Sequence, residues 1–183
     1  MRRRFIVTVS SLKEMKEYAP PLARCVTAAL MVSHGLRGEA DLVLHELEGG
    51  FSVHFTQRVR GVRPDEASVM GILARAFRAA ECTGEAPRSV YSGVIVCRGR
   101  LQQFLTGFPG KWLCDTQGLE LRQLAPSGDP VAFIVPLDAA PQLAAVTRLK
   151  CPIDLLWPDQ LISLINVWLD RAAGGGACAS RRC

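Results

Sequence analysis

The fold is decided by two segments and the loops that follow them, all within residues 131–171. The first, Val131-Ala132-Phe133-Ile134-Val135, is apolar and is stopped by Pro136. A short helical pattern then leads to the loop Cys151-Pro152-Ile153-Asp154-Leu155-Leu156-Trp157-Pro158, and an amphipathic helix is predicted over Asp159 to Arg171. In an open α/β sheet, ligands bind outside the carboxyl ends of the strands, where neighbouring loops diverge. We therefore expect these two loops to form a cofactor site.

Strand-like and helical patterns alternate along the rest of the chain. Apolar or alternating runs predict strands, the run 51–55 being half-buried, and Pro20-Pro21 and Pro64 are suited to a first helical turn. Strands are expected at 5–9, 41–46, 51–55, 90–96, 112–114 and 131–135, and helices at 20–35, 64–78 and 99–105. This order indicates a single α/β domain over 1–172 with a largely parallel sheet. Residues 173–183 have too little apolar content to order themselves and are expected to form a flexible tail.

Composition limits the class of protein. The chain has 183 residues, of which 49% are hydrophobic and 21% charged, enough for one domain with a substantial core. No apolar run approaches the roughly 20 residues that span a bilayer, and the run Phe5 to Val9 is no signal peptide. We therefore expect a cytoplasmic protein without a membrane segment.

The seven cysteines form no CxxC pair and have no ligand spacing with the three histidines. This pattern argues against a zinc site and suits buried thiols in a reducing compartment, so no metal is expected. The chain also lacks GxGxxG, P-loop and GxSxG patterns, which makes nucleotide-dependent oxidoreductases, kinases and serine hydrolases poor candidates.

The net charge of +5 makes a polyanion a plausible partner, although a mildly basic soluble protein would look the same. Arginines concentrate in the first half of the chain. His54 lies in an alternating strand and is expected at the surface or as core filler. His34 lies in Ser33-His34-Gly35-Leu36-Arg37, where it is either a helix terminus or part of a site.

Three groups of motifs resemble a known family. They are Arg24-Cys25-Val26-Thr27-Ala28-Ala29-Leu30 with Ser33-His34-Gly35-Leu36-Arg37; Gly61-Val62-Arg63-Pro64-Asp65-Glu66-Ala67-Ser68; and Ser92-Gly93-Val94-Ile95-Val96, with Gln160 and Leu169-Asp170-Arg171 in the closing helix. Together they are similar to the TrmY-type tRNA pseudouridine N1-methyltransferases of the SPOUT class. The resemblance covers most of residues 2–171.

The resemblance implies a SPOUT-type α/β fold with a C-terminal trefoil knot, a homodimer, and S-adenosylmethionine bound in the knot loops. It implies N1-methylation of pseudouridine in the T-arm of tRNA, at position 54. Cofactor contacts would fall on Leu113, Val135, Pro136, Cys151, Pro152, Ile153, Asp154, Leu155, Leu156 and Leu161. Where the family has Gly-Asp-His, this chain has Pro136-Leu137-Asp138, and the family's Leu-Gly-Pro loop is also altered. Two alternatives therefore stay open: a SPOUT-fold RNA-binding protein without catalysis, and a methyltransferase acting on ribosomal RNA.

The family match also suggests where RNA and the acid–base groups would lie. Arg24, His34, Arg37 and Arg63 are candidate RNA contacts, since arginine commonly binds phosphates and bases. Asp65, supported by Glu66, is the candidate base or proton relay, because backbone amides can orient a carboxylate at a helix start. The alternative is that Asp65 only caps the helix.

Overall fold

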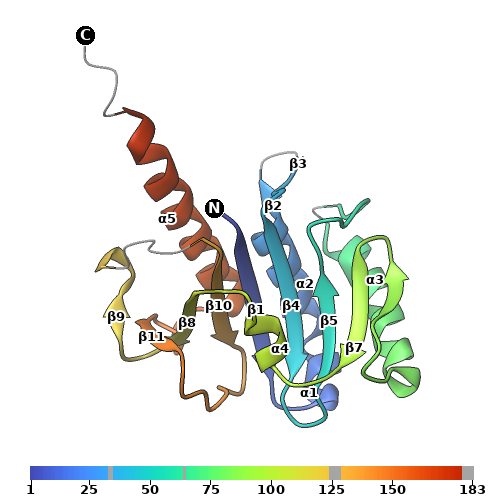
Figure 1. Cartoon of the computed structure of the whole chain (residues 1–183). Coiled ribbons are helices and arrows are strands. Elements are labelled where there is room, and N and C mark those ends of the chain that lie inside the picture. The colour runs from blue at the N-terminus through green and yellow to red at the C-terminus, as the bar shows by residue number, and fades with distance from the viewer. Residues whose placement is uncertain (33–34, 64, 124–128, 179–183) are drawn as a thin grey trace.

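A large twisted sheet forms the centre of the molecule (Figure 1). In the computed structural model, residues 1–32, 35–63, 65–123 and 129–178 are described, with side chains described up to Ala172. Within these ranges a nine-stranded sheet has the order β6-β7-β5-β4-β1-β10-β8-β11-β9. Its strands are β1 (Arg3–Val9), β4 (Ala40–Glu46), β5 (Phe51–Phe55), β6 (Arg88–Tyr91), β7 (Val94–Arg98), β8 (Gly110–Asp115), β9 (Leu119–Glu120), β10 (Val131–Pro136) and β11 (Thr147–Lys150).

The neighbouring strands β4, β1, β10, β8, β11 and β9 are parallel, so the expected largely parallel sheet is confirmed, although β11 and β9 were not predicted. On the other side of β4, the strands β5, β7 and β6 continue the sheet antiparallel. The central strand β1 pairs in register with both neighbours, so that Phe5 lies opposite Leu42 and Phe133. All seven residues of β1 are buried, which explains why the residues after its two arginines are apolar except for Thr8.

Two cores lie on the two faces of this sheet. The helices α1 (Leu12–Glu17), α2 (Ala19–Leu30), α3 (Glu66–Ala79) and α5 (Pro158–Cys178) cover one face, and α4 (Gln102–Leu105) lies on the other (Figure 1). Successive strand residues alternate between the two faces. Phe5 and Leu42 therefore belong to the large core, and Ile6 and Val43 to the smaller core beneath α4.

Several expected elements differ in the structure. The run 90–96 is two strands, because Gly93 turns the chain with φ +73°, and a Cβ there would lie 2.3 Å from the Val59 nitrogen. The helix expected over 20–35 ends at Leu30 and is followed by the short ribbon β2 (Met31–Val32) and β3 (Gly35–Leu36). The sequence reading missed α1, β9, β11 and the 3-10 turns Ala80–Cys82 and Leu121–Gln123.

Two further expectations about patterning were wrong. The helical pattern after Pro136 forms no helix; residues 137–146 are a loop with bends and a turn that leads into β11. The alternation in β5 predicted a half-buried strand, yet Ser52 is fully buried. Its hydroxyl satisfies the Nδ1 atom of buried His45 at 2.8 Å, so a polar residue inside the sheet produced the misleading alternation.

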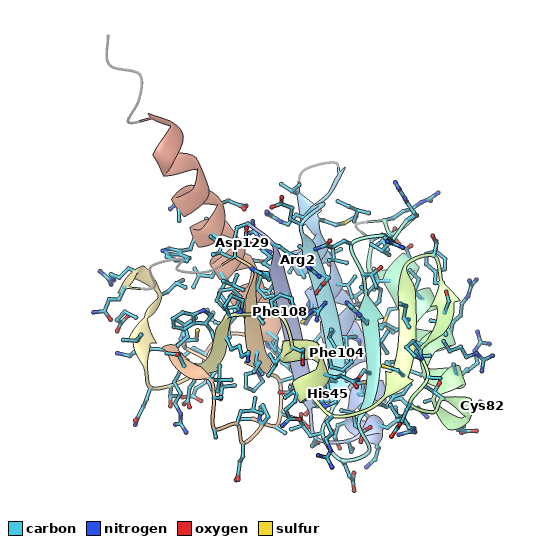
Figure 2. All side chains as sticks on the ribbon, in the orientation of Figure 1. Arg2, His45, Cys82, Phe104, Phe108 and Asp129 are labelled. Atoms are coloured by element: carbon cyan, nitrogen blue, oxygen red, sulfur yellow. The ribbon has the colours of Figure 1, made fainter. Side chains whose placement is uncertain are left out.

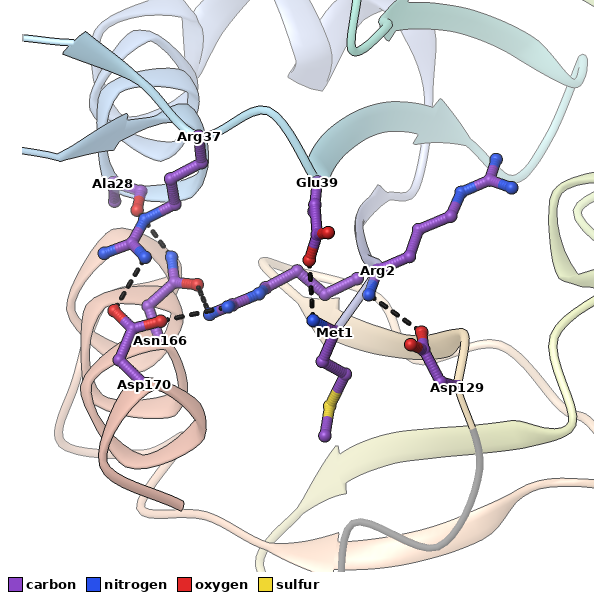
Figure 3. Close-up of polar contacts among 9 residues, drawn as sticks. Met1, Arg2, Ala28, Arg37, Glu39, Asp129, Asn166 and Asp170 are labelled. Carbon is purple, nitrogen blue, oxygen red and sulfur yellow. Dashed lines mark hydrogen bonds and ion pairs between the residues drawn. The ribbon is translucent and has the colours of Figure 1, made fainter. Parts of the chain in front are cut away.

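Polar contacts, of which the one between Arg3 and Asn166 is buried, fix α5 against the amino end of the sheet (Figure 3). Arg3 donates to Asn166 Oδ1 at 2.8 Å and to Asp170 Oδ1 at 2.9 Å. Asp170 also accepts from Arg37 at 2.6 Å, and Asn166 donates to the Ala28 carbonyl at 2.8 Å. Burial alone would raise the pKa of Asp170, but the hydrogen bonds from Arg37 and Arg3 lower it.

The last helix continues to Cys178, beyond the expected end at Arg171, and its C-terminal part projects past the sheet (Figure 1). Among the described residues, no helix combines the length and apolarity needed to cross a membrane.

Candidate active site

The loop after β10 and the loop before α5 line one hollow at the carboxyl end of the parallel strands, as the sequence predicted. Its volume is 290 Å³, and its lining consists of Pro136, Leu137 and residues 153–158. Two large apolar side chains in its lining are poorly covered: Leu155 is 83% exposed and Trp157 is 49% exposed. Exposed large apolar side chains in a hollow are typical of an interaction or ligand-binding site.

Hydrogen bonds hold the first loop in place. Asp138 accepts from the backbone nitrogen of Ser10 at 2.9 Å and from its hydroxyl at 2.6 Å. Thr8 Oγ1 donates to the Ala139 carbonyl at 2.7 Å. The residues at the end of β1 therefore fix the loop that follows β10.

The second loop is held by its own backbone. Leu155 and Leu156 both donate to the Pro152 carbonyl at 3.0 Å, and Cys151 donates to the Asp115 carbonyl at 2.7 Å. These bonds fix the loop as a turn on the end of β8. Two anchored loops thus face one another across the hollow, which limits the ordering that a ligand would have to impose.

The residues expected to contact a cofactor divide into three groups. Pro136, Ile153, Asp154, Leu155 and Leu156 line the hollow, and Cys151 and Pro152 line an adjoining one of 330 Å³. Leu113, Val135 and Leu161 are buried in the core and line neither. Leu137, Trp157 and Pro158 were missed, although each adjoins a predicted residue in sequence.

Arg24 connects three helices beside the hollow. Its guanidinium lies 3.4 Å from Asp159 Oδ2 at the start of α5 and 3.8 Å from Glu66 Oε2 at the start of α3. The other oxygen of Asp159, Oδ1, is buried without a hydrogen-bond partner among the described residues. The predicted residues Arg24 and Glu66 are therefore brought together next to Pro158, which lines the hollow.

The remaining predicted residues lie in different settings. Asp65 caps α3 by accepting from the Ser68 nitrogen at 2.7 Å, so the capping interpretation describes its observed contact. Arg37 is committed to Asp170, with 16% of its side chain exposed. Arg63 is exposed and forms no ion pair within the described part of the chain, and His34 lies outside the described residues.

The buried thiols near the site differ: a hydrogen bond with Cys114 lowers the pKa of Cys151, whereas the pKa values of Cys25 and Cys114 are raised. Burial, with the Asp159 charge as a smaller cause, raises the pKa of Cys25 well above its usual range. A hydrogen bond to Cys151 and burial raise the pKa of Cys114 in the same direction. Thiols held in their neutral form are poor nucleophiles and poor metal ligands. Over the described ranges, no group of three His, Cys, Asp or Glu residues could hold a metal ion.

Comparison with known proteins identifies the family. Residues 20–135 match a family model described as "Putative SAM-dependent RNA methyltransferase". This chain belongs to that family of RNA methyltransferases. The match includes α2, α3 and the strand that ends in the first loop of the hollow.

Three archaeal proteins are similar to the chain, and each is called tRNA (pseudouridine(54)-N(1))-methyltransferase. The Halobacterium salinarum protein is 33% identical over 113 residues, covering 60% of this chain and 57% of the relative. The Halorubrum lacusprofundi protein is 30% identical over 175 residues, covering 81% and 82%. The Methanococcoides burtonii protein is 29% identical over 171 residues, covering 84% and 83%.

A solved structure shows the fold class of this chain. Archaeoglobus fulgidus Nep1 bound to S-adenosylhomocysteine superposes with a TM-score of 0.64, at 10% identity, over 95% of this chain and all of that one. The fold is thus the SPOUT type expected from the sequence.

Proposed function

We propose that the chain transfers a methyl group from S-adenosylmethionine to N1 of pseudouridine at position 54 of tRNA. The observation that supports this most directly is the hollow between the two loops, in a member of an RNA methyltransferase family. The names of the three archaeal relatives supply the nucleotide and the position. Such an enzyme would work in the cytoplasm, where tRNA is found.

The hollow suits S-adenosylmethionine in its chemistry. Leu155 and Trp157 offer exposed apolar surface for an adenine ring, and Pro136, Ile153 and Leu156 complete the lining. When bound, the group supplies a methyl on a positively charged sulfur. We also propose that the C-terminal segment, with the second loop and α5, is threaded into a trefoil knot. In this arrangement both loops contact the same ligand.

The reaction breaks a sulfur–carbon bond, forms a nitrogen–carbon bond and releases the N1 proton of pseudouridine. The protein must therefore position the base and accept that proton. Glu66 is the better of the two candidate bases, because Asp65 is committed to its helix cap whereas the Arg24 contact of Glu66 is long, at 3.8 Å. Holding the two reactants in line can supply about 7–11 kcal/mol in favourable cases, so little further side-chain chemistry is needed.

We propose that Arg24 and Arg63, with His34 and Arg37, contact the RNA, and that two copies of the chain form the active unit. On α5, Leu164 and Val167 are each 48% exposed and lie three residues apart, which places them on one helix face. This apolar face is the proposed contact between the two copies.

A second candidate function, RNA binding without catalysis, has one observation in its favour. No glycine lies in either loop of the hollow, and Pro136 offers no backbone donor to a ligand. Calorimetry with S-adenosylhomocysteine separates the two functions, since methyl transfer requires saturable binding at millimolar ligand or below.

The activity itself is tested with a T-arm hairpin that carries pseudouridine at position 54. Incubation with the protein and S-adenosylmethionine should yield N1-methylpseudouridine by nucleoside mass spectrometry, and the matched hairpin with uridine at 54 should yield none. If the protein methylates a ribosomal RNA fragment and not the hairpin, its substrate is ribosomal RNA and not tRNA. No product with either RNA, together with no binding of S-adenosylhomocysteine, would leave only the RNA-binding function.

A further inference from the structure

A second hollow lies on the face of the sheet that carries α4, where Arg4 of its lining contacts Phe104. It is at the amino ends of the parallel strands, whereas the two loops of the first hollow lie at the carboxyl ends. It has a volume of 620 Å³ and opens over the amino ends of β1 and β4 and the β6–β7 hairpin. The residues that matter in it are Arg2, Arg4, Asp41, His54, Arg58 and Ser89. The methyl-transfer proposal uses none of them.

The floor of this hollow is a closed ion pair. Arg4 donates to both oxygens of Asp41, at 2.6 and 2.8 Å, and to the Phe104 carbonyl at 2.9 Å. Both side chains are at least nine-tenths buried. Burial alone would raise the pKa of Asp41, but the contacts with Arg4 and His54 lower it, so the carboxylate stays charged and neutralises Arg4.

One polar atom in the hollow has no partner. The Nε2 atom of His54 is buried without a hydrogen bond among the described residues, and its distance of 3.7 Å from Asp41 Oδ2 is too long for one. An unsatisfied buried polar atom costs about 1–3 kcal/mol, so it calls for an explanation. A ligand oxygen in the hollow would supply the missing partner.

Two cations line the same hollow as this histidine. Arg2 and Arg58 are exposed and form no ion pair within the described ranges. The Arg2 guanidinium lies 5.6 Å from the centre of the Phe108 ring, and its backbone nitrogen is held by Asp129 at 2.8 Å. Figure 2 shows Arg2 and Phe108 together in front of the sheet, and in Figure 3 the Arg2 side chain extends away from the neighbouring carboxylates. Since Arg4 is already neutralised, these two arginines give the hollow an unpaired positive charge.

We propose that this hollow binds a phosphate group of the RNA substrate, with Arg2 and Arg58 as its charged contacts and His54 as a hydrogen-bond donor. Arginines 58, 60 and 63 lie on one segment that leads from the hollow to Glu66 and Arg24. All three are exposed and without an ion pair in the described part of the chain. Arg58 and Glu66 are eight residue steps apart and thus at most about 28 Å apart, so a strand of a few nucleotides can connect the two sites. This inference rests on RNA being the substrate and not on methyl transfer.

The test is equilibrium binding of a fluorescent T-arm hairpin, measured by anisotropy over a range of salt concentrations. Arg58→Ala and Arg2→Ala should each weaken binding roughly tenfold, since a charge-assisted hydrogen bond is lost. Each should also flatten the dependence of log affinity on log salt by about 0.7–0.9, the value for one phosphate contact. Arg78→Ala, on the far end of α3, removes the same charge from an exposed arginine without an ion pair among the described residues, and should change neither quantity. Equal losses in all three variants would overturn the proposal.

Nuclear magnetic resonance separates the sources of the phosphate. Shifts of the His54 ring and the Arg2 and Arg58 amides with the hairpin alone support an RNA strand, and shifts with uridine 5′-monophosphate as well support a pocket that also takes free nucleotides. No shift with either ligand overturns the site. Calorimetry with S-adenosylhomocysteine should be unchanged in all variants, so failure here is distinguishable from failure of the methyl-transfer proposal.

Discussion

Arg24 on α2 lies 3.4 Å from Asp159 on α5, and this ion pair joins α2 to the start of α5, directly after the loop that lines the first hollow. Only 17% of the Asp159 side chain is exposed, and its second oxygen has no hydrogen-bond partner among the described residues. The carboxylate therefore depends on Arg24 for compensation of its charge.

Loss of Arg24 should consequently cost more than loss of an ordinary surface charge. We expect Arg24→Ala to lower the free energy of unfolding by about 1–3 kcal/mol, because it leaves a largely buried carboxylate uncompensated. Urea denaturation of Arg24→Ala, Asp159→Asn and the double variant should give a coupling energy above about 0.5 kcal/mol. Glu66→Gln, which removes only the exposed 3.8 Å contact, should cost less than about 0.5 kcal/mol. A coupling of zero would show that the two residues do not depend on one another.

The apolar lining of the hollow predicts a loss of cofactor affinity without a loss of stability. Leu155 is 83% exposed, so Leu155→Ala should leave the melting temperature unchanged while weakening S-adenosylhomocysteine binding roughly tenfold, about 1.4 kcal/mol. Trp157→Ala should weaken it at least as much. Leu119→Ala is the matched control, since Leu119 is 45% exposed and does not line the hollow. Equal affinity of Leu155→Ala and wild type would place the ligand elsewhere.

The sequence predicted the central parallel strands β1, β4 and β10 because they are buried and read as apolar runs, whereas β9 and β11 at the edge of the sheet are largely exposed and were missed. It also predicted that the loops after β10 and before α5 would lie together. Prolines mark both loops, and loops at the carboxyl ends of neighbouring strands form ligand sites in open α/β sheets. Within the loops, the pattern could not separate lining residues from core residues. Val135 and Leu161 are as apolar as Leu155, and only packing decides that the first two are buried and the third is exposed.

Where the sequence misled, a buried polar contact or a turn was responsible. Ser52 is polar but lies inside the sheet as the partner of His45, which produced a false half-buried pattern. Gly93 supports a left-handed turn, and one apparent strand is therefore a hairpin. The second hollow was invisible for a similar reason: Arg4, Asp41 and His54 are far apart in the chain and meet only because β1, β4 and β5 are neighbours.

Asp170 makes the stability of α5 depend on acid. Its pKa is lowered in the folded protein, so the stabilisation is complete above the unfolded pKa near 4 and is lost as pH falls through the folded pKa. Asp170→Asn should lower the free energy of unfolding at pH 7 by about 1 kcal/mol, a value discounted because 40% of the side chain is exposed. The deficit should shrink below pH 4 in urea titrations. Glu81→Gln, an exposed carboxylate without an ion pair in the described ranges, should follow wild type at every pH, and a constant Asp170→Asn deficit would contradict the prediction.

His45 should make the protein sensitive to acid at a higher pH. Burial lowers its pKa to about 4, whereas the unfolded chain binds the proton near pH 6.5. Between these pH values the unfolded state holds more protons than the folded state. The contribution of His45 to the free energy of unfolding is therefore complete above pH 6.5 and is lost as pH falls towards 4. The loss amounts to about 3 kcal/mol in total, at roughly 1.4 kcal/mol per pH unit. His45→Asn can keep a hydrogen bond to Ser52 without binding a proton. Its free energy of unfolding should therefore fall less steeply than that of wild type between pH 6.5 and 4.5, whatever constant offset the smaller side chain introduces. Parallel curves would show that folding does not lower the pKa of His45.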